Sequence, residues 1–145
     1  MNGVGYDPGV ASHAALQEIR RALSRHPALL DAYADPPAQF TQILADLDPR
    51  VLGGTSESGS LTVRWYAGKS ADALPEFVFH YSDDSGFDCG WHHEPNPHVD
   101  GWGHFQERLS AEEEYSYEPV TFGSEVPVRV CWVVMEWLEE QIKSH

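Results

Sequence analysis

Half of the histidines in this chain lie in one short segment, and histidine is the side chain best suited to proton transfer and metal binding near neutral pH. The segment GWHHEPNPHVDGWGHFQER, residues 90–108, holds four of the eight histidines: His92, His93, His98 and His104. Such crowding fits an acid–base site, a metal site, or an ordinary polar loop stiffened by its two prolines. The chemistry depends on where the neighbouring elements place these side chains.

Residues on both sides of this loop alternate between apolar and polar, as in two strands of an antiparallel sheet. If Trp91 and Phe105 share the buried face, His92 lies opposite His104 on the other face. Neighbouring strands are about 4.8 Å apart, so paired imidazoles can touch. Two adjacent imidazoles do not both ionise easily, which favours the neutral ring of a general base beside the protonated ring of a general acid.

The preceding turn adds further polar residues to the same face. A loop over residues 83–85, with Gly86 in the left-handed conformation, predicts His80 opposite Asp88. The next hairpin predicts Asp88 opposite Arg108. Arg108 would supply a fixed cation for a phosphate or a developing oxyanion, and Asp88 would orient Arg108 or His80.

The predicted register forms two polar rows across three strands. They read Glu76, His92, His104 and His80, Asp88, Arg108, with Val78, Gly90 and Gln106 between them. The expected catalytic residues are His92, His104, Arg108 and Asp88, and the expected substrate contacts are His80, Gln106, Trp102 and His93. Trp102 could stack on a base. This set suits metal-independent cleavage of a phosphodiester by its 2′-hydroxyl; alternatively, the face is merely solvated.

The same histidines also allow a metal site. His93, His98 and His104, together with Asp100 or Glu94, offer the nitrogen and oxygen ligands that zinc or nickel accepts. Their spacing matches no standard zinc finger. The second interpretation is therefore a non-catalytic, zinc-type metal-binding or protein-interaction module built on this loop.

Alternation also predicts the strands that carry these residues. They cover residues 61–66, 77–82, 87–92 and 104–109, and YSYEPVTF is a candidate fifth strand. In front of them, Ser12 is a candidate N-cap for a helix that ends at His26 and Pro27. Further helical segments are predicted over residues 27–33 and at Phe40, Ile43, Leu44 and Leu47. From Ser124 onward, a broad apolar stripe predicts a closing amphipathic helix.

These elements predict an α+β fold, with an antiparallel sheet of four to five strands and both the N-terminal helices and the C-terminal helix packed on one face. We expect one domain over residues 1–145. It comprises a helical front at 10–50, a flexible connection at 53–60 (GGTSESGS), and a strand-rich body with the closing helix at 61–143.

The composition is strongly acidic, with 23 acidic and 9 basic residues and a net charge of −14. Only Lys69 and Lys143 are lysines, a balance typical of proteins from salt-accumulating organisms, where molar salt screens charges beyond about 3 Å. Cys89 and Cys131 lie in apolar segments and are expected to be buried thiols. No apolar run reaches about 18 residues and no secretory start is present, so we expect a soluble, cytoplasmic protein with no membrane partner.

Three segments resemble the TumE-like toxins of toxin–antitoxin systems: FHYSDDSG, HHEPNPHVDGWGHFQER and EPVTFGSEVPVRVCWVVMEWLEEQI. The similarity covers roughly residues 60–142 and includes the histidine-rich segment before the closing helix. The proline-spaced HHEPNPH departs from the family pattern. Membership would imply growth inhibition through RNA and an antitoxin of the helix-turn-helix class. Together with the histidine pair, it leads us to expect a toxin that is a ribonuclease without a cofactor, with zinc as the alternative, and it allows a homo-oligomer.

Overall fold

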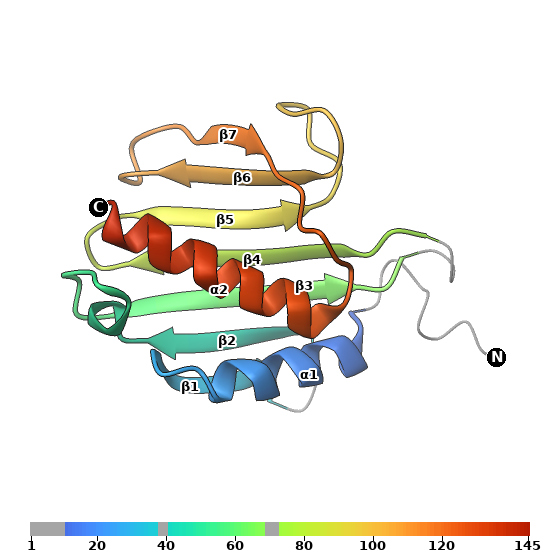
Figure 1. Ribbon diagram of the computed structural model, residues 1–145, viewed down its shortest axis with the longest axis horizontal. Coiled ribbons are helices and arrows are strands. Elements are labelled where there is room, and N and C mark those ends of the chain that lie inside the picture. The colour runs from blue at the N-terminus through green and yellow to red at the C-terminus, as the bar shows by residue number, and fades with distance from the viewer. Residues whose placement is uncertain (1–10, 38–40, 69–72) are drawn as a thin grey trace.

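Seven antiparallel strands follow one another in chain order and form a single sheet in the computed structural model of the protein (Figure 1). The structure describes residues 11–37, 41–68 and 73–145. The strands are β1 (Leu29–Asp35), β2 (Gln42–Leu47), β3 (Gly59–Tyr66), β4 (Glu76–Asp83), β5 (Asp88–His93), β6 (Gly103–Arg108) and β7 (Ser116–Pro119).

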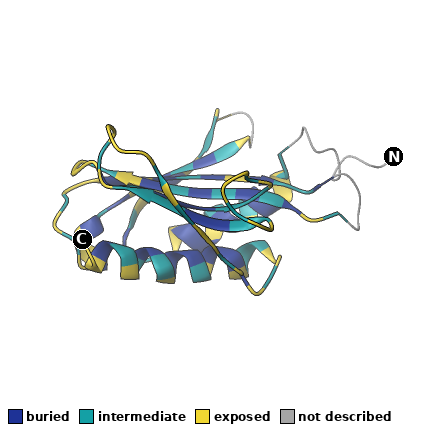
Figure 2. Ribbon diagram, turned by 90° about the horizontal axis from the view of Figure 1, so that it is seen from above, coloured by how far each residue is buried: buried dark blue, intermediate teal, exposed yellow. Residues whose placement is uncertain are grey.

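Both α-helices, α1 (His13–Ser24) and α2 (Pro127–Lys143), lie against one face of the sheet, and no helix of the described residues covers the other (Figure 2). We call this second face the polar face. Ser12 caps α1 as predicted, because its hydroxyl accepts a hydrogen bond from Ala15 N–H at 3.3 Å. Within the described part of the chain, neither helix is long and apolar enough to cross a membrane.

One apolar core lies between the helices and the sheet. Its largest fully buried side chains include Tyr81, Phe77 and Phe79 of β4. Burial of a large apolar side chain contributes about 1.5–3 kcal/mol, so this layer stabilises the fold. Cys89 and Cys131 are buried free thiols in the same core, as predicted. The polar face is therefore free to carry side chains that do not build the core.

The sheet has seven strands where the sequence predicted four to five, because two segments predicted as helical are strands β1 and β2. Ile43, Ala45 and Leu47 are buried, whereas Leu44 points to the other face. The apolar residues of this segment fit a helix or a strand by spacing alone. The segment forms a strand because β2 pairs with β1 on one side and with β3 on the other.

Smaller differences concern the ends of elements. A short 3-10 helix, η2 (Pro49–Leu52), precedes the predicted flexible connection, and Gly59 of that connection already belongs to β3. Leu109, predicted to point inward, is exposed because β6 ends at Arg108. The predicted apolar position Phe40 lies outside the described residues.

The β4–β5 hairpin begins its loop one residue later than predicted. Asp83 N–H donates to Phe87 O at 3.1 Å, and Gly86 N–H donates to Asp83 O at 3.1 Å, so the loop is residues 84–86. Gly86 has the predicted left-handed conformation, with φ of 96°. Asp83 fixes the start of the turn, because its carboxylate accepts Ser85 N–H at 2.9 Å.

This change moves the pairing of β4 by two residues, which keeps each side chain on its predicted face because strand alternation has a period of two. Phe79 pairs with Trp91, and His80 pairs with Gly90 instead of the predicted Asp88. The predicted row across β4 to β6 is therefore wrong at its β4 positions.

Glu76 is the residue that leaves its predicted row. It lies opposite Tyr66 of β3, whereas Val78 lies opposite His92. The displacement removes a carboxylate from beside His92 on β4, and a different carboxylate takes this role in the structure.

His26 lies at the turn from α1 to β1, and its surroundings should make the stability of the fold depend on pH. His26 Nδ1 accepts a hydrogen bond from Ala28 N–H at 3.0 Å, which only the neutral ring with its proton on Nε2 allows. Burial lowers the pKa of His26 below its usual 6.5, against an opposing effect of Glu139. The stability that depends on the neutral ring is complete above about pH 6.5 and is lost as the pH falls below it toward the folded pKa.

When the pH is lowered from about 7.5 to about 5, we expect the free energy of unfolding to fall less in His26→Asn than in the wild type. The amide oxygen can accept the same hydrogen bond without titrating, and the difference should be about 1 kcal/mol, the contribution of one such bond. Urea unfolding at both pH values measures it. An equal loss in both proteins would contradict this role of His26.

Candidate active site

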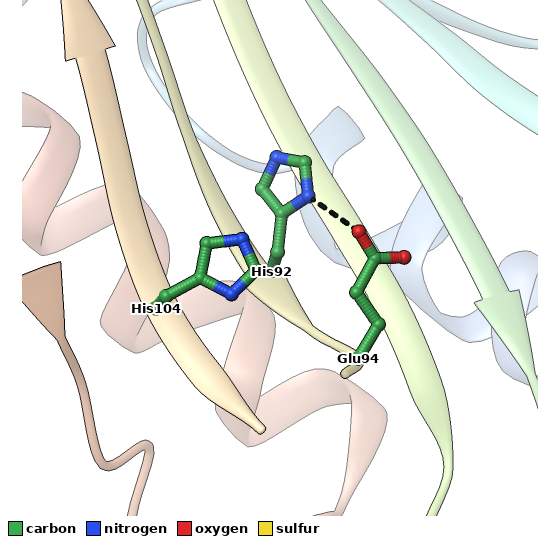
Figure 3. A group of neighbouring side chains, drawn as sticks. All are labelled: His92, Glu94 and His104. Atoms are coloured by element: carbon green, nitrogen blue, oxygen red, sulfur yellow. Dashed lines mark hydrogen bonds and ion pairs between the residues drawn. The ribbon is translucent and has the colours of Figure 1, made fainter. Parts of the chain in front are cut away.

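His92 and His104 face each other across β5 and β6 on the polar face, as the sequence predicted (Figure 3). Their ring centroids are 4.9 Å apart, and the rings are inclined by 28°. The same hairpin places Asp88 opposite Arg108, also as predicted. Both cross-strand pairs are thus confirmed by the register of β5 and β6.

The Asp88 carboxylate joins three side chains of the polar face. Arg108 donates to it from Nε and Nη2 at 3.2 and 3.1 Å, and the Tyr115 hydroxyl donates at 2.9 Å. His80 Nε2 forms a short contact with the same carboxylate. Because the carboxylate accepts from all three, the proton of this contact lies on His80 Nε2. Burial first, and then Asp88, raises the pKa of Tyr115 to about 12, so its hydroxyl stays a donor.

His80 consequently presents its other nitrogen, Nδ1, as an acceptor. Burial lowers the pKa of His80, although Asp88 opposes this effect, so the ring is neutral near pH 7. Its side chain is 25% exposed, against 16% for Asp88. A partly exposed imidazole that a less exposed carboxylate orients is the arrangement of a general base.

A second histidine is oriented in the same way by Glu94, which follows β5 (Figure 3). His92 Nδ1 lies 3.1 Å from a Glu94 carboxylate oxygen. The hydrogen bond from His92 lowers the pKa of Glu94, so this carboxylate stays ionised and accepts. His92 Nε2 is left as an acceptor, and it is buried with no hydrogen-bond partner.

The two free nitrogens converge over Gly90. A Cβ on this residue would lie 2.8 Å from His92 Nε2 and closer still to His80 Nδ1, so no other residue type fits without displacing the rings. The ring centroids of His80 and His92 are 5.8 Å apart and nearly perpendicular. Two facing acceptors need a proton, a water or another donor between them. The space above Gly90, which lies between the two predicted rows, is therefore where a proton can lie between the two rings.

His104 is the one buried polar residue among those that the structure describes, with no exposed surface. Its Nε2 lies 3.3 Å from the Asn96 amide nitrogen, and its Nδ1 has no partner. Burial, followed by the charge of His92, lowers the pKa of His104. The ring is therefore a neutral neighbour of His92 and is closed to a substrate in this conformation.

His92, Glu94 and His104 also form a group that could hold a metal ion, because one ligand atom from each lies within 4.8 Å of the others. This group differs from the predicted set of His93, His98 and His104. The difference arises because His93 points to the opposite face of β5, where it stacks on Phe77, and His98 stacks on Tyr117. Two nitrogens and one carboxylate oxygen are a ligand set of the kind that zinc accepts.

The remaining predicted contacts are divided between the two faces of the sheet. Gln106 lies on the polar face, opposite Gly90. His93 stacks on Phe77 with 5.0 Å between ring centroids and contacts Trp102 at 5.3 Å. His93 and Trp102 line a separate cavity of about 980 Å³ at the end of the sheet, so the structure does not bring them together with the other predicted site residues.

Tyr115 and Tyr117 belong to the polar face and were missed as site residues. Tyr115 contacts Asp88 as described, and Tyr117 lies opposite Gln106 on β7. The signal was present in the sequence, because two tyrosines in YSY are two positions apart and so share one face of a strand.

No protein-family model, curated protein or solved structure matches this chain. The catalytic and metal-binding proposals therefore rest on the geometry of the described residues.

Asp88→Asn should lower the free energy of unfolding by about 2–3 kcal/mol, because the amide would leave the Arg108 charge without a counter-charge and one donor without a partner. Chemical denaturation measures the change. Asp48→Asn is the matched control: Asp48 also pairs with an arginine, Arg50, but this arginine is 59% exposed. Exposed ion pairs contribute little, and Asn also caps well. Equal losses in the two variants would contradict the central position of Asp88.

Proposed function

We propose that the protein cleaves RNA by metal-independent acid–base catalysis. The observation that carries the proposal is the convergence of His80 Nδ1 and His92 Nε2 over Gly90, each ring being oriented by its own carboxylate. A histidine pair with opposite protonation states suits the transfer of two protons in one reaction.

In the proposed reaction, neutral His80 removes the proton of a ribose 2′-hydroxyl, and the 2′-oxygen attacks the adjacent phosphorus. The bond from phosphorus to the 5′-oxygen breaks, and His92 gives to that leaving oxygen the proton that it holds on Nε2 once a proton enters the gap between the two acceptors. The products are a 2′,3′-cyclic phosphate and a 5′-hydroxyl. Because His92 Nε2 is buried in the free protein, the substrate has to open the gap as it binds.

Arg108 is assigned to the phosphate. Two of its nitrogens are bound to Asp88, and its side chain is 26% exposed, so further N–H groups can reach a ligand. A guanidinium held in place stabilises the charge that develops on the phosphoryl oxygens. His104 packs against His92 and is a positioning residue in this proposal. His80 replaces it as the second histidine that contacts the substrate.

Metal binding is the second candidate function. His92, Glu94 and His104 cluster within 4.8 Å, and two of their nitrogens are buried without partners. A zinc ion held by these three side chains would make the loop a metal-binding module. Both candidates use His92, so metal content and chelator sensitivity distinguish them.

As a biological role, we propose that the protein is the toxin of a toxin–antitoxin pair, with a helix-turn-helix antitoxin as its partner. The resemblance of residues 60–142 to TumE-like toxins supports this role, and RNA cleavage would account for growth inhibition. The net charge of −14 repels RNA at low salt. Contact chemistry in molar salt, as in a halophilic cell, is the setting in which the proposal applies.

RNA cleavage should persist in a chelator and should fall by about 100-fold or more in His80→Ala and in His92→Ala. The double variant should lose little beyond the worse single one, since residues acting as one unit are not additive. Cleavage of single-stranded and structured RNA in molar KCl measures these effects. His13→Ala is the control, because His13 begins α1 on the other side of the sheet.

Elemental analysis is the measurement that can contradict the enzyme proposal. If the purified protein holds stoichiometric zinc, and His92→Ala and His104→Ala lose it while no folded protein cleaves RNA, the enzyme proposal fails. The metal-binding function then takes its place.

Expression in cells should arrest growth, and His80→Ala and His92→Ala should abolish the arrest at equal protein levels. Co-expression of an adjacent helix-turn-helix protein should restore growth with the wild type. Growth curves and total RNA integrity measure both effects. Unimpaired growth with folded wild-type protein and intact RNA would contradict the toxin role.

A further inference from the structure

A cleft beside the proposed reaction centre is lined by aromatic rings. It has a volume of about 390 Å³ and lies between β6, β7 and the loop before β6. The lining residues are His98, Arg108, Glu113, Glu114, Tyr115 and Tyr117. Arg108 and Tyr115 both bind Asp88, so the cleft adjoins the group that orients His80. A nucleotide next to the reacting phosphate would lie at this position.

The cleft already accommodates a face-to-face stack of flat rings. His98 lies on Tyr117 with 4.3 Å between ring centroids and an interplanar angle of 8°. His98 itself is on the exposed loop before β6, where Asn96 Oδ1 accepts its backbone N–H at 2.7 Å. An exposed imidazole stacked in this way occupies the place that a nucleobase would take, because bases stack on tyrosine in single-stranded RNA.

The lining of the cleft includes two acidic residues, Glu113 and Glu114. Glu113 is held by a turn in which its backbone N–H donates to Ser110 O at 3.2 Å and its carboxylate accepts from the Ser110 hydroxyl at 3.3 Å. Glu114 follows it in the cleft wall. Carboxylates only accept hydrogen bonds, so they select a base with donors on its edge. Guanine offers adjacent N1–H and N2–H groups, which match the two oxygens of one carboxylate.

We propose that this cleft binds a guanine base of the RNA, stacked on Tyr117 in place of His98 and held at its N1–H and N2–H edge by Glu113 or Glu114. The inference rests on the proposed RNA cleavage for its biological meaning. It makes the protein selective for RNA in which guanosine lies beside the cleaved bond.

Binding of 5′-mononucleotides tests the cleft apart from cleavage, because these ligands contain no bond between nucleotides. Titrations of the full-length protein in molar KCl, followed by NMR, should show guanosine monophosphate binding about tenfold tighter than inosine monophosphate, which lacks the N2 amino group. Cytidine and uridine monophosphates should bind more weakly still.

Variants assign the selectivity to named residues. Glu113→Gln with Glu114→Gln should remove the difference between guanosine and inosine monophosphates, and Tyr117→Ala should weaken both by about fivefold or more, the effect of one base stack. His98→Ala should bind guanosine monophosphate more tightly, because no imidazole has to leave. Tyr117→Leu repeats the test if Tyr117→Ala does not fold, and Tyr33→Ala on β1 is the control.

Equal binding of guanosine, inosine and cytidine monophosphates, or no binding at millimolar ligand, would overturn the inference. The same holds for weaker binding in His98→Ala. Guanosine binding that persists in folded His80→Ala and His92→Ala supports the cleft even where no RNA is cleaved, so failure of the cleft and failure of the proposed function remain distinguishable.

Discussion

The polar face depends on the carboxylate of Asp88, which accepts hydrogen bonds from His80 on β4, Arg108 on β6 and Tyr115 beyond it. These three side chains come from separate segments, and a single acceptor fixes their relative positions. A carboxylate can do this because its two oxygens offer several acceptor sites at little steric cost. The arrangement sets the tautomer of His80, and it holds Arg108 close to the place where a phosphate would lie.

A second constraint is the division of the sheet into two faces. Both helices pack on one face, so the core is complete without contributions from the other (Figure 2). The polar face can then keep groups that a core would exclude, including the buried, unpartnered nitrogens of His92 and His104. Each such nitrogen costs about 1–3 kcal/mol. Such a loss of stability is smallest where a ligand, a proton or an ion binds to the unpartnered nitrogen.

The loop before β6 connects the two regions to which functions are assigned. Asn96 contacts His104 through its amide nitrogen, and its amide oxygen accepts the backbone N–H of His98. His98 in turn covers Tyr117. Asn96 and His98 therefore join the loop to His104 on one side and to Tyr117 on the other.

Local sequence patterns determined much of this protein by themselves. Alternation predicted strands β3 to β6 and the facing pair of His92 and His104, a capping residue predicted the start of α1 at Ser12, and an apolar stripe predicted the closing helix. Period-two patterns are local, and a wrong face would bury polar groups. Only the tertiary structure decided that the segment around Ile43 is a strand, since its spacing also fits a helix and pairing with β1 and β3 supplies the difference. The same holds for the site. A shift of two residues in the β4 register preserves every face, so no pattern could tell whether His80 lies opposite Asp88 or Gly90, and the turn at Asp83 settled it.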